Sequence, residues 1–320
     1  MTGGAGYIGS HTVRALRTAG RSVVVLDTLE LGHADAVIDA PLVVGEIADE
    51  ALVEGVCREH GVDTIVHFAA YKNVGESMRE PSKYFRNNVD GTVRLLDAAR
   101  RAGVDQVVFS SSCSVYGTPD SVPVDESQAI RPESVYAETK AIVERVLHWY
   151  GELHGLCSVS LRYFNAAGAS LDGRLGEDWT YALNLIPVAI RALLVGDRRL
   201  QVYGDDYPTP DGTCVRDYIH IIDLARAHIL AMGPGRRGFF NLGNGEGYSV
   251  REVIQMCERV TGQSIKAIEQ LRRHGDPPKL VASAEKARKE LGWKPEYPML
   301  EDIVASAWRW HQQHPSGYPD

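Results

Sequence analysis

Apolar residues in the first half of the chain alternate between two kinds of segment. Short runs rich in Val, Ile and Phe are typical of buried strands, and apolar residues three and four positions apart are typical of helices. In chain order we predict a helix over residues 8–19, a strand over 22–26, a helix over 49–60, a strand over 63–68, a helix over 81–102 and a strand over 106–110. This alternation predicts an α/β fold with a Rossmann-like, doubly wound parallel sheet.

Polar residues follow the ends of the predicted strands. They lie at 27–28, 45–47, 69–72 and 110–112. Open α/β sheets bind their ligands beyond the carboxyl ends of the strands, so these segments are where we expect a site.

The pattern loosens after Arg162. Gly, Pro and Asp gather at 168–179 and again at 204–212, which indicates loops with turn chemistry. A chain of 320 residues has room for about two domains. We therefore predict a first domain over 1–164 and a smaller α/β domain over 165–320, parts of which return to the first sheet.

A glycine-rich turn opens the chain, with Gly at positions 3, 4, 6 and 9. Glycines at this spacing, just before a helix, let backbone N–H groups approach a pyrophosphate. Asp27 ends the next predicted strand, close to the usual spacing of about 20 residues for a carboxylate that binds a ribose diol. A carboxylate there favours NAD over NADP, because it repels a 2′-phosphate.

Only Met1 and Thr2 precede the glycines, where this fold needs a strand. Either the sequence starts too late to include the whole strand, or a central strand is missing. We favour the first interpretation, because loss of a central strand leaves buried neighbours unpaired.

Tyr136 and Lys140 are four residues apart in a predicted helix over 135–152. Side chains at this spacing share one helix face, so an ammonium there can lower the pKa of the phenol and make it a base near neutral pH. Ser134 is the expected N-cap, which places Tyr136 in the first turn. By spacing alone, a half-buried core tyrosine beside a solvated lysine is the commoner interpretation.

The serines at 110–112 have two interpretations as well. Three serines after a strand are most often an ordinary loop, but they stand at a predicted strand end, shortly before Tyr136. A serine hydroxyl bonded to a substrate oxygen beside the phenol is the alternative. Further on, Arg216, Arg272 and Arg273 are candidates for binding a diphosphate.

Composition excludes several classes of protein. The formal charge of -8 argues against a surface for nucleic acid. The five cysteines are widely spaced and odd in number, which favours a reducing, cytoplasmic setting. The longest apolar run, 185–195, is too short to span a membrane, and we see neither a secretory leader nor the spacing of a metal site.

Together these features resemble the extended short-chain dehydrogenase/reductase superfamily, and within it the UDP-glucose 4-epimerase family. The resemblance covers nearly the whole chain. Beyond the glycine turn, Asp27, the serines and the Tyr136/Lys140 pair, it is carried by His67-Phe68-Ala69-Ala70, Lys72, Val74-Gly75-Glu76-Ser77, Asn87-Asn88-Val89, Leu161-Arg162-Tyr163-Phe164-Asn165, Tyr207-Pro208-Thr209-Pro210-Asp211-Gly212-Thr213, Val215-Arg216-Asp217-Tyr218-Ile219-His220 and His314-Pro315-Ser316-Gly317-Tyr318-Pro319-Asp320.

The resemblance implies three groups of site residues. The catalytic group is Ser112, Tyr136 and Lys140, with Ser112 and Tyr136 also contacting the sugar. The positions implied to bind NAD tightly are Gly3, Gly6, Tyr7, Ile8, Gly9, Asp27, Glu46, Ile47, Phe68, Ala69, Ala70, Lys72, Asn87, Ser110, Tyr136, Lys140 and Tyr163. The positions implied to bind the UDP-sugar are Asn165, Asn184, Leu185, Gln201, Tyr203, Arg216, Arg273, Asp276 and Leu280.

Two positions depart from the family pattern. Glu46 stands where an Asp is expected beside the adenine amine, and Leu280 stands where relatives carry Tyr or a small residue beside the sugar. Glu46 puts the adenine contact in question, and Leu280 leaves tolerance of an N-acetyl group open.

The resemblance implies reversible 4-epimerisation of UDP-glucose and UDP-galactose through a 4-keto sugar. Alternatives are an epimerase for UDP-glucuronate or UDP-N-acetylglucosamine and, with less support, a non-catalytic NAD-binding protein. A 4,6-dehydratase is disfavoured, because Cys113-Ser114 offers no acid pair. The resemblance also implies a homodimer paired through the helices over 81–102 and 135–152.

Overall fold

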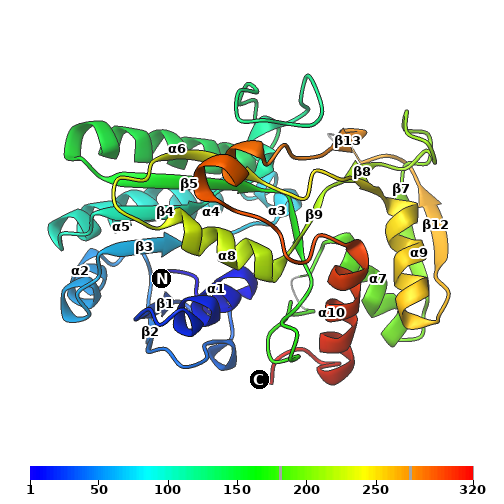
Figure 1. The fold of residues 1–320 in the computed structure, drawn as a ribbon, viewed down its shortest axis with the longest axis horizontal. Coiled ribbons are helices and arrows are strands. Elements are labelled where there is room, and N and C mark those ends of the chain that lie inside the picture. The colour runs from blue at the N-terminus through cyan, green and yellow to red at the C-terminus, as the bar shows by residue number, and fades with distance from the viewer. Residues whose placement is uncertain (180–181, 274–275, 320) are drawn as a thin grey trace. The chain divides into compact units, whose positions relative to one another are not determined.

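The computed structural model describes residues 1–179, 182–273 and 276–319 (Figure 1). Asp320, the last residue of the C-terminal segment quoted above, lies outside the described residues. The α-helices are α1 (Tyr7–Thr18), α2 (Glu50–Glu59), α3 (Val74–Ser77), α4 (Pro81–Tyr84), α5 (Gly91–Arg101), α6 (Val135–His154), α7 (Leu185–Leu194), α8 (Ile221–Ala231), α9 (Val250–Thr261) and α10 (Leu300–Gln313). Shorter helical turns are η1 (Ala34–Ala36), η2 (Phe85–Asp90), η3 (Cys113–Tyr116) and η4 (Ala287–Leu291).

The strands are β1 (Val25–Asp27), β2 (Leu42–Val44), β3 (Thr64–His67), β4 (Gln106–Ser110), β5 (Cys157–Tyr163), β6 (Asn165–Ala167), β7 (Arg199–Tyr203), β8 (Val215–Arg216), β9 (Tyr218–His220), β10 (Gly238–Leu242), β11 (Tyr248–Ser249), β12 (Lys266–Gln270) and β13 (Lys279–Leu280). The chain forms two compact units. The first consists of residues 1–117, 129–162 and 225–240, and the second of 118–128, 163–224 and 241–320.

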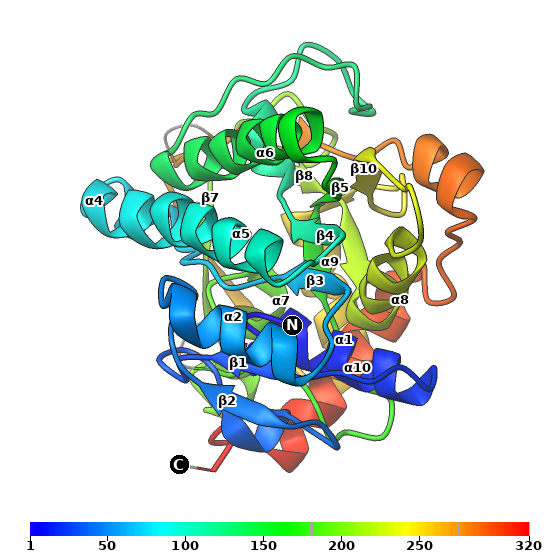
Figure 2. The same cartoon turned by 90° about the vertical axis from the view of Figure 1, so that its left-hand side faces the viewer.

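The first unit contains the predicted parallel sheet. β1 pairs in parallel with β2, and β3, β4 and β5 pair in parallel, with β10 hydrogen-bonded to β5. Figure 2 shows α5 and α6 on one face of this sheet and α1 on the other. Apolar residues of α2, α5 and α6 form a buried cluster with the sheet. The doubly wound α/β prediction is confirmed.

Met1 and Thr2 fill the central position of this sheet. Thr2 forms parallel bridges with Leu26 of β1 and with His67 of β3. On one side Leu26 N donates to Met1 O at 2.8 Å, and on the other Phe68 N donates to Thr2 O at 2.9 Å. Loss of a central strand would leave backbone groups of β1 and of the segment after β3 unpaired. At this end of the two strands, those groups are bonded to Met1 and Thr2.

The helix predicted over 81–102 is present, but its middle is π-helical instead of α-helical. α4 passes into a π-helical turn, η2, before α5 begins. The wide turn contains Asn88, whose buried side chain accepts from Tyr71 N at 2.9 Å and donates to Thr139 Oγ1 at 3.1 Å. These bonds to residues distant in sequence stabilise the wider turn. Such π-helical turns are frequent at functional sites.

The second unit combines short strand pairs with the helices α7, α9 and α10. β6 pairs in parallel with β9, β7 with β12, and β8 lies between β11 and β13. Buried apolar residues of α7, α9 and α10 form its core. Asp217, between β8 and β9, accepts backbone N–H bonds from Asn244, Gly245 and Ala282 at 2.9, 3.0 and 3.1 Å. Because it joins three segments distant in sequence, this buried carboxylate organises the unit around β8.

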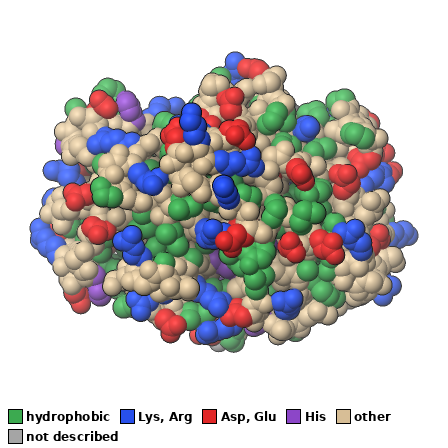
Figure 3. All heavy atoms as spheres, in the orientation of Figure 1, with side chains coloured by type: hydrophobic (Ala, Val, Ile, Leu, Met, Phe, Trp, Pro, Cys, Tyr) green, Lys and Arg blue, Asp and Glu red, His purple; other side chains and the backbone are tan. Residues whose placement is uncertain are grey.

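None of the helices among the described residues is long and apolar enough to cross a membrane. On the face drawn in Figure 3, acidic and basic side chains are interspersed.

His67 is buried at the end of β3 in a defined tautomer. Thr92 Oγ1 donates to Asn88 O at 2.6 Å, so it accepts from His67 Nε2, which lies 2.9 Å away. His67 Nδ1 is then the acceptor for the Thr2 hydroxyl at 2.7 Å. Burial, assisted by the nearby cations of Lys140 and the N-terminus, lowers the pKa of His67 to about 3.

This histidine is expected to make the fold sensitive to acid. An unfolded histidine titrates near pH 6.5, so below that pH the unfolded state binds more protons and stability falls as pH falls. Between pH 7.5 and 5, wild type should lose about 2 kcal/mol more of its unfolding free energy than His67→Asn loses. Urea unfolding at the two pH values measures this difference. Equal losses in the two proteins would show that His67 is not held neutral.

Candidate active site

The glycine turn packs tightly against the segment that follows β3. Gly3 has a φ of 71°, and a Cβ there would lie 2.5 Å from Ala69 N. A Cβ on Gly9 would overlap the carbonyl oxygen of Gly3. The turn therefore accepts only glycine at both positions, and it leads directly into α1 at Tyr7.

The start of α1 fits an anion. Among the described side chains none caps this helix, and its first turn contains no acidic residue. A helix N-terminus attracts negative charge through its backbone N–H groups and its dipole. The residues present therefore fit the pyrophosphate of a dinucleotide.

Asp27 lies beside the glycine turn, as the strand spacing predicted. Its carboxylate accepts from Ala5 N and from Leu29 N, each at 2.9 Å. These bonds hold the carboxylate at the carboxyl end of β1. The fold therefore joins the two halves of the dinucleotide motif, which are separated by about 20 residues, as the motif requires.

The other residues predicted to contact the cofactor lie mainly at the carboxyl edge of the same sheet. Glu46 and Ile47 follow β2, Phe68 to Lys72 follow β3, Ser110 ends β4 and Tyr163 ends β5. Asn87 lies in the π-helical turn and donates to the Asn88 side chain at 2.9 Å. Tyr163, the last residue of β5, belongs to the second unit, whereas the others belong to the first unit.

The capped helix α6 positions the predicted tyrosine and lysine. Ser134 Oγ accepts from Ala137 N at 3.2 Å, so α6 begins where the sequence predicts. Tyr136 stands in its first turn, and its backbone N donates to Ser77 Oγ at 3.2 Å. Lys140 Nζ lies 5.8 Å from the centre of the Tyr136 ring. The phenol and the amine share one helix face, as expected from their spacing.

Lys140 is buried and directed at the serine loop. Its Nζ donates to Ser110 O at 2.7 Å and lies 4.8 Å from the centre of the Phe109 ring. Burial lowers the pKa of Lys140 to about 7, and the charge of Glu144 opposes that shift. In the protein alone, Lys140 is therefore poised near neutral pH between its two protonation states.

The three serines differ in their contacts and in their burial. Ser110 presents its carbonyl to Lys140, and the Ser111 side chain is completely buried. Ser112 is partly exposed, and its Oγ accepts from Ser114 N at 3.2 Å and from Ser114 Oγ at 2.9 Å. Because these bonds use acceptor positions, the Ser112 hydroxyl keeps its own proton to donate.

In the second unit, one group of the predicted UDP residues forms around β8. Arg216 donates to Pro277 O at 2.8 Å and to Asp276 Oδ1 at 3.3 Å. Leu280 is buried and pairs with Arg216 in the β13–β8 register. Asn165 Nδ2 donates to Asp217 O at 2.8 Å.

A second group forms at the end of β7. Tyr203 OH donates to Gln201 Oε1 at 2.5 Å, and the Arg273 guanidinium lies 3.9 Å from the centre of the Tyr203 ring. Arg272, a further candidate from the sequence, is instead bonded to Asp206 at 2.6 Å. Asn184 and Leu185 stand apart from both groups in sequence, at the N-cap and first residue of α7.

Sequence reasoning missed the residues that support the catalytic group. Asn88 and Thr139 connect the π-helical turn to α6, and Glu144 lies one helical turn beyond Lys140. The adjacent asparagines at 87 and 88 were a signal in the sequence, but which of the two is buried depends on the π-helical turn. Among the described residues, no group of three His, Cys, Asp or Glu could hold a metal ion.

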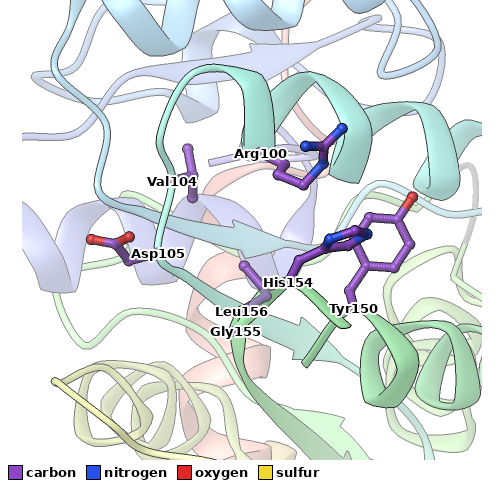
Figure 4. Close-up of a pocket in the computed structure, with 7 residues that line it drawn as sticks. All are labelled: Arg100, Val104, Asp105, Tyr150, His154, Gly155 and Leu156. Atoms are coloured by element: carbon purple, nitrogen blue, oxygen red, sulfur yellow. The ribbon is translucent and has the colours of Figure 1, made fainter. Parts of the chain in front are cut away.

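A small hollow of about 50 Å³ lies at the opposite edge of the sheet (Figure 4). Its lining comes from the ends of α5 and α6 and from the segments before β4 and β5: Arg100, Val104, Asp105, Tyr150, His154, Gly155 and Leu156. None of the predicted site residues lines it. It lies at the amino ends of the strands, away from the edge where this fold binds ligands.

Comparisons with known proteins agree with this geometry. The NAD-dependent epimerase/dehydratase family model matches residues 1–243. A UDP-glucose 4-epimerase of Halalkalibacterium halodurans is 49% identical over 322 residues, which cover 99% of this chain and 96% of that protein. The crystal structure of the Brucella ovis UDP-glucose 4-epimerase in complex with NAD has a TM-score of 0.93 and 46% identity, covering 96% of each chain.

A third similar structure carries a nucleotide as well. The UDP-glucose 4-epimerase of Bifidobacterium longum, solved in complex with NAD⁺ and UDP, has a TM-score of 0.92 and 38% identity over 99% of this chain and 98% of that one. The family model covers well over half of the chain, and the relatives are similar along nearly their whole length. The chain therefore belongs to the NAD-dependent epimerase/dehydratase family, and within it to the UDP-glucose 4-epimerases.

Proposed function

We propose that this enzyme interconverts UDP-glucose and UDP-galactose by inverting the C4 carbinol of the hexose, with NAD as its bound cofactor. The observation that carries the proposal is the catalytic group at the end of β4. Tyr136 and Lys140 share one face of α6, Lys140 Nζ contacts Ser110 O at 2.7 Å, and Ser112 follows in the same loop. Membership of the UDP-glucose 4-epimerase family supports the choice of substrate.

The proposed roles follow from where protons and charges must go. NAD⁺, when bound, supplies the chemistry of accepting a hydride from C4 and returning it to the other face. Tyr136 takes the proton of the O4 hydroxyl and later gives a proton back. The Lys140 ammonium stabilises the tyrosinate, and the Ser112 hydroxyl donates to the sugar oxygen. The phenol serves both half-reactions, because oxidation and reduction occur at the same carbon.

The second unit is proposed to hold the UDP group while the sugar turns over. Arg216 and Arg273 are the cations proposed for the diphosphate, and aromatic and amide side chains near them are proposed to bind the uridine. Asp276 and Pro277 orient the Arg216 guanidinium. Firm binding of the diphosphate with few polar contacts to the hexose lets the sugar present either face without leaving the enzyme.

Leu280 supports the preference for hexoses without an N-acetyl group. Its side chain is buried in β13, beside Arg216. A branched apolar side chain fills more space than the small residue of some relatives and offers no partner to an amide. We therefore place UDP-glucose and UDP-galactose ahead of UDP-N-acetylglucosamine and UDP-glucuronate.

A panel of UDP-sugars tests the substrate. Purified protein, with no NAD or reductant added, should convert UDP-galactose to UDP-glucose and reach the same mixture from either side. UDP-N-acetylglucosamine and UDP-glucuronate should react at least about 10-fold more slowly in kcat/KM, the discrimination that roughly 1.4 kcal/mol provides. Turnover of UDP-glucuronate alone would overturn the substrate assignment. Retention of NAD through gel filtration is the accompanying expectation.

We further propose a homodimer in the cytoplasm. α6 exposes Trp149 and Leu153, whose side chains are 59% and 69% exposed, and Phe85 of the neighbouring π-helical turn is 37% exposed. A second copy that covers these helices would bury this apolar surface. None of the five cysteines, all within the described residues, is in a disulfide, which supports a reducing compartment.

A further inference from the structure

A buried ion pair lies behind the serine loop in the first unit. Arg162, at the end of that unit's β5 segment, donates to both carboxylate oxygens of Glu144 on α6, at 2.9 and 2.6 Å. The two side chains are only 4% and 5% exposed. Arg162 also donates to Tyr116 OH at 2.9 Å and lies 4.5 Å from the centre of the Phe239 ring. The carboxylate therefore occupies one defined position.

Ser111 connects this ion pair to the catalytic residues. Its Oγ donates to Glu144 Oε1 at 2.6 Å, and its backbone N donates to Leu161 O at 3.0 Å. The residue before it presents the carbonyl that accepts from Lys140 Nζ, and the residue after it is Ser112. A single hydrogen bond thus links the middle of the serine loop to the helix that carries the tyrosine and the lysine.

Stability alone does not account for this arrangement. Replacing a buried ion pair by apolar side chains of similar volume is often neutral or stabilising. Apolar side chains could not offer an acceptor for the Ser111 hydroxyl, nor a negative charge one helical turn from Lys140. Those two properties are specific to a carboxylate at this place.

We infer that Ser111 and Glu144 are positioning residues for the proposed epimerisation. Glu144, oriented by Arg162, holds the Ser110–Ser112 loop against α6, so that the Ser110 carbonyl meets Lys140 and Ser112 is fixed in the same loop. Its charge also favours the ammonium form of Lys140. The inference rests on the proposed function for its kinetic readout, but the contacts that it invokes lie entirely within the first unit.

Groups other than Glu144 also lie near Lys140. The ring centre of Tyr136, one turn earlier on the same helix, lies 5.8 Å from Lys140 Nζ, His67 lies at the end of β3, and Phe109 of β4 presents its ring. The His67 imidazole is held neutral, so it contributes no charge. Glu144 is the group whose charge acts on Lys140 to favour the ammonium.

The first test removes only the hydrogen bond. Ser111→Ala should lower kcat by about 10- to 100-fold, the range expected for one bond to a charged group, with KM within about twofold and NAD retained. Ser111→Cys, which keeps a weak donor of similar size, should be intermediate. The matched control is Ser306→Ala, a buried hydroxyl of the second unit that bonds His220 at 3.0 Å. The control should lose stability but keep kcat.

The second test separates charge from position. Glu144→Gln combined with Arg162→Met removes both charges and keeps an oxygen acceptor for Ser111. Loss of the carboxylate makes Lys140 deprotonate at lower pH, so the alkaline limb of the kcat–pH profile should move to lower pH. Ser111→Ala leaves the charges in place and should leave that limb unmoved. An alkaline limb unmoved in the double variant would overturn the electrostatic role.

A structure of Ser111→Ala supplies a readout that does not depend on which sugar reacts. The distance from Lys140 Nζ to Ser110 O, 2.7 Å in wild type, should lengthen beyond hydrogen-bond range. An unchanged distance together with wild-type kcat would overturn the positioning role while leaving the proposed function intact. A lengthened distance in an enzyme that fails with every UDP-sugar would support positioning and contradict the proposed function.

Discussion

Tyr136→Phe is expected to remove nearly all epimerase activity while NAD stays bound. Phenylalanine keeps the ring and its packing but cannot take or return the O4 proton. General acid–base groups contribute about 10²- to 10⁴-fold, so kcat should fall by that factor. Rates are measured with UDP-galactose at saturation, and the NAD content of the purified variant is compared with that of wild type.

Tyr150→Phe is the matched control. Tyr150 lies on the same helix, and its hydroxyl donates to Asp97 at 2.9 Å, at the edge of the sheet away from the catalytic group. This variant should keep its kcat within about twofold and lose about 1 kcal/mol of stability with the hydrogen bond. If Tyr136→Phe kept more than about a tenth of the activity, the proposed acid–base role would be wrong.

Arg216→Leu is expected to weaken UDP binding by about 10- to 100-fold, because one or two charge-assisted hydrogen bonds to phosphate are lost. The guanidinium is held by Pro277 O and Asp276, so wild type presents it with little loss of side-chain freedom. A diphosphate contact acts equally in the ground and transition states. KM should therefore rise by the same factor, with kcat little changed.

Calorimetric titration with UDP measures the binding term directly. Arg251→Leu is the control, since Arg251 belongs to the same unit but forms a surface ion pair with Glu269 at 2.8 Å. Surface pairs of this kind contribute about 0–1 kcal/mol, and UDP affinity should not change. A fall in kcat at constant KM in Arg216→Leu would place this arginine near the reacting carbon instead of at the diphosphate.

Much of the candidate site could be predicted from local sequence patterns. The glycine turn could be recognised because its backbone conformation excludes a Cβ at Gly3. The Tyr136/Lys140 pair follows from the period of the helix, and Ser134 marks the start of α6 through an ordinary N-cap. Asp27 follows from the spacing between the turn and the end of β1. The first three features depend on residues close in sequence. The fourth depends on the usual spacing between the glycine turn and the end of the next parallel strand.

Long-range contacts lay beyond sequence patterns. The helical periodicity over 81–102 does not reveal the π-helical turn. That turn is accompanied by hydrogen bonds from Asn88 to Tyr71 and Thr139, which are distant in sequence. Likewise, spacing cannot rank three adjacent serines. Ser111 is the buried one because Glu144 accepts its hydroxyl, and Glu144 is held in turn by Arg162.

The sequence by itself determined the fold class, the dinucleotide turn, the pairing of phenol with amine and the family, because helix period, glycine geometry and ordered motifs are encoded locally. The tertiary structure alone decided how Thr2 pairs with both β1 and β3, which serine faces the ion pair, and how far burial lowers the pKa of Lys140. Those properties arise from desolvation and from contacts between residues far apart in the chain. Only the folded protein brings such residues together.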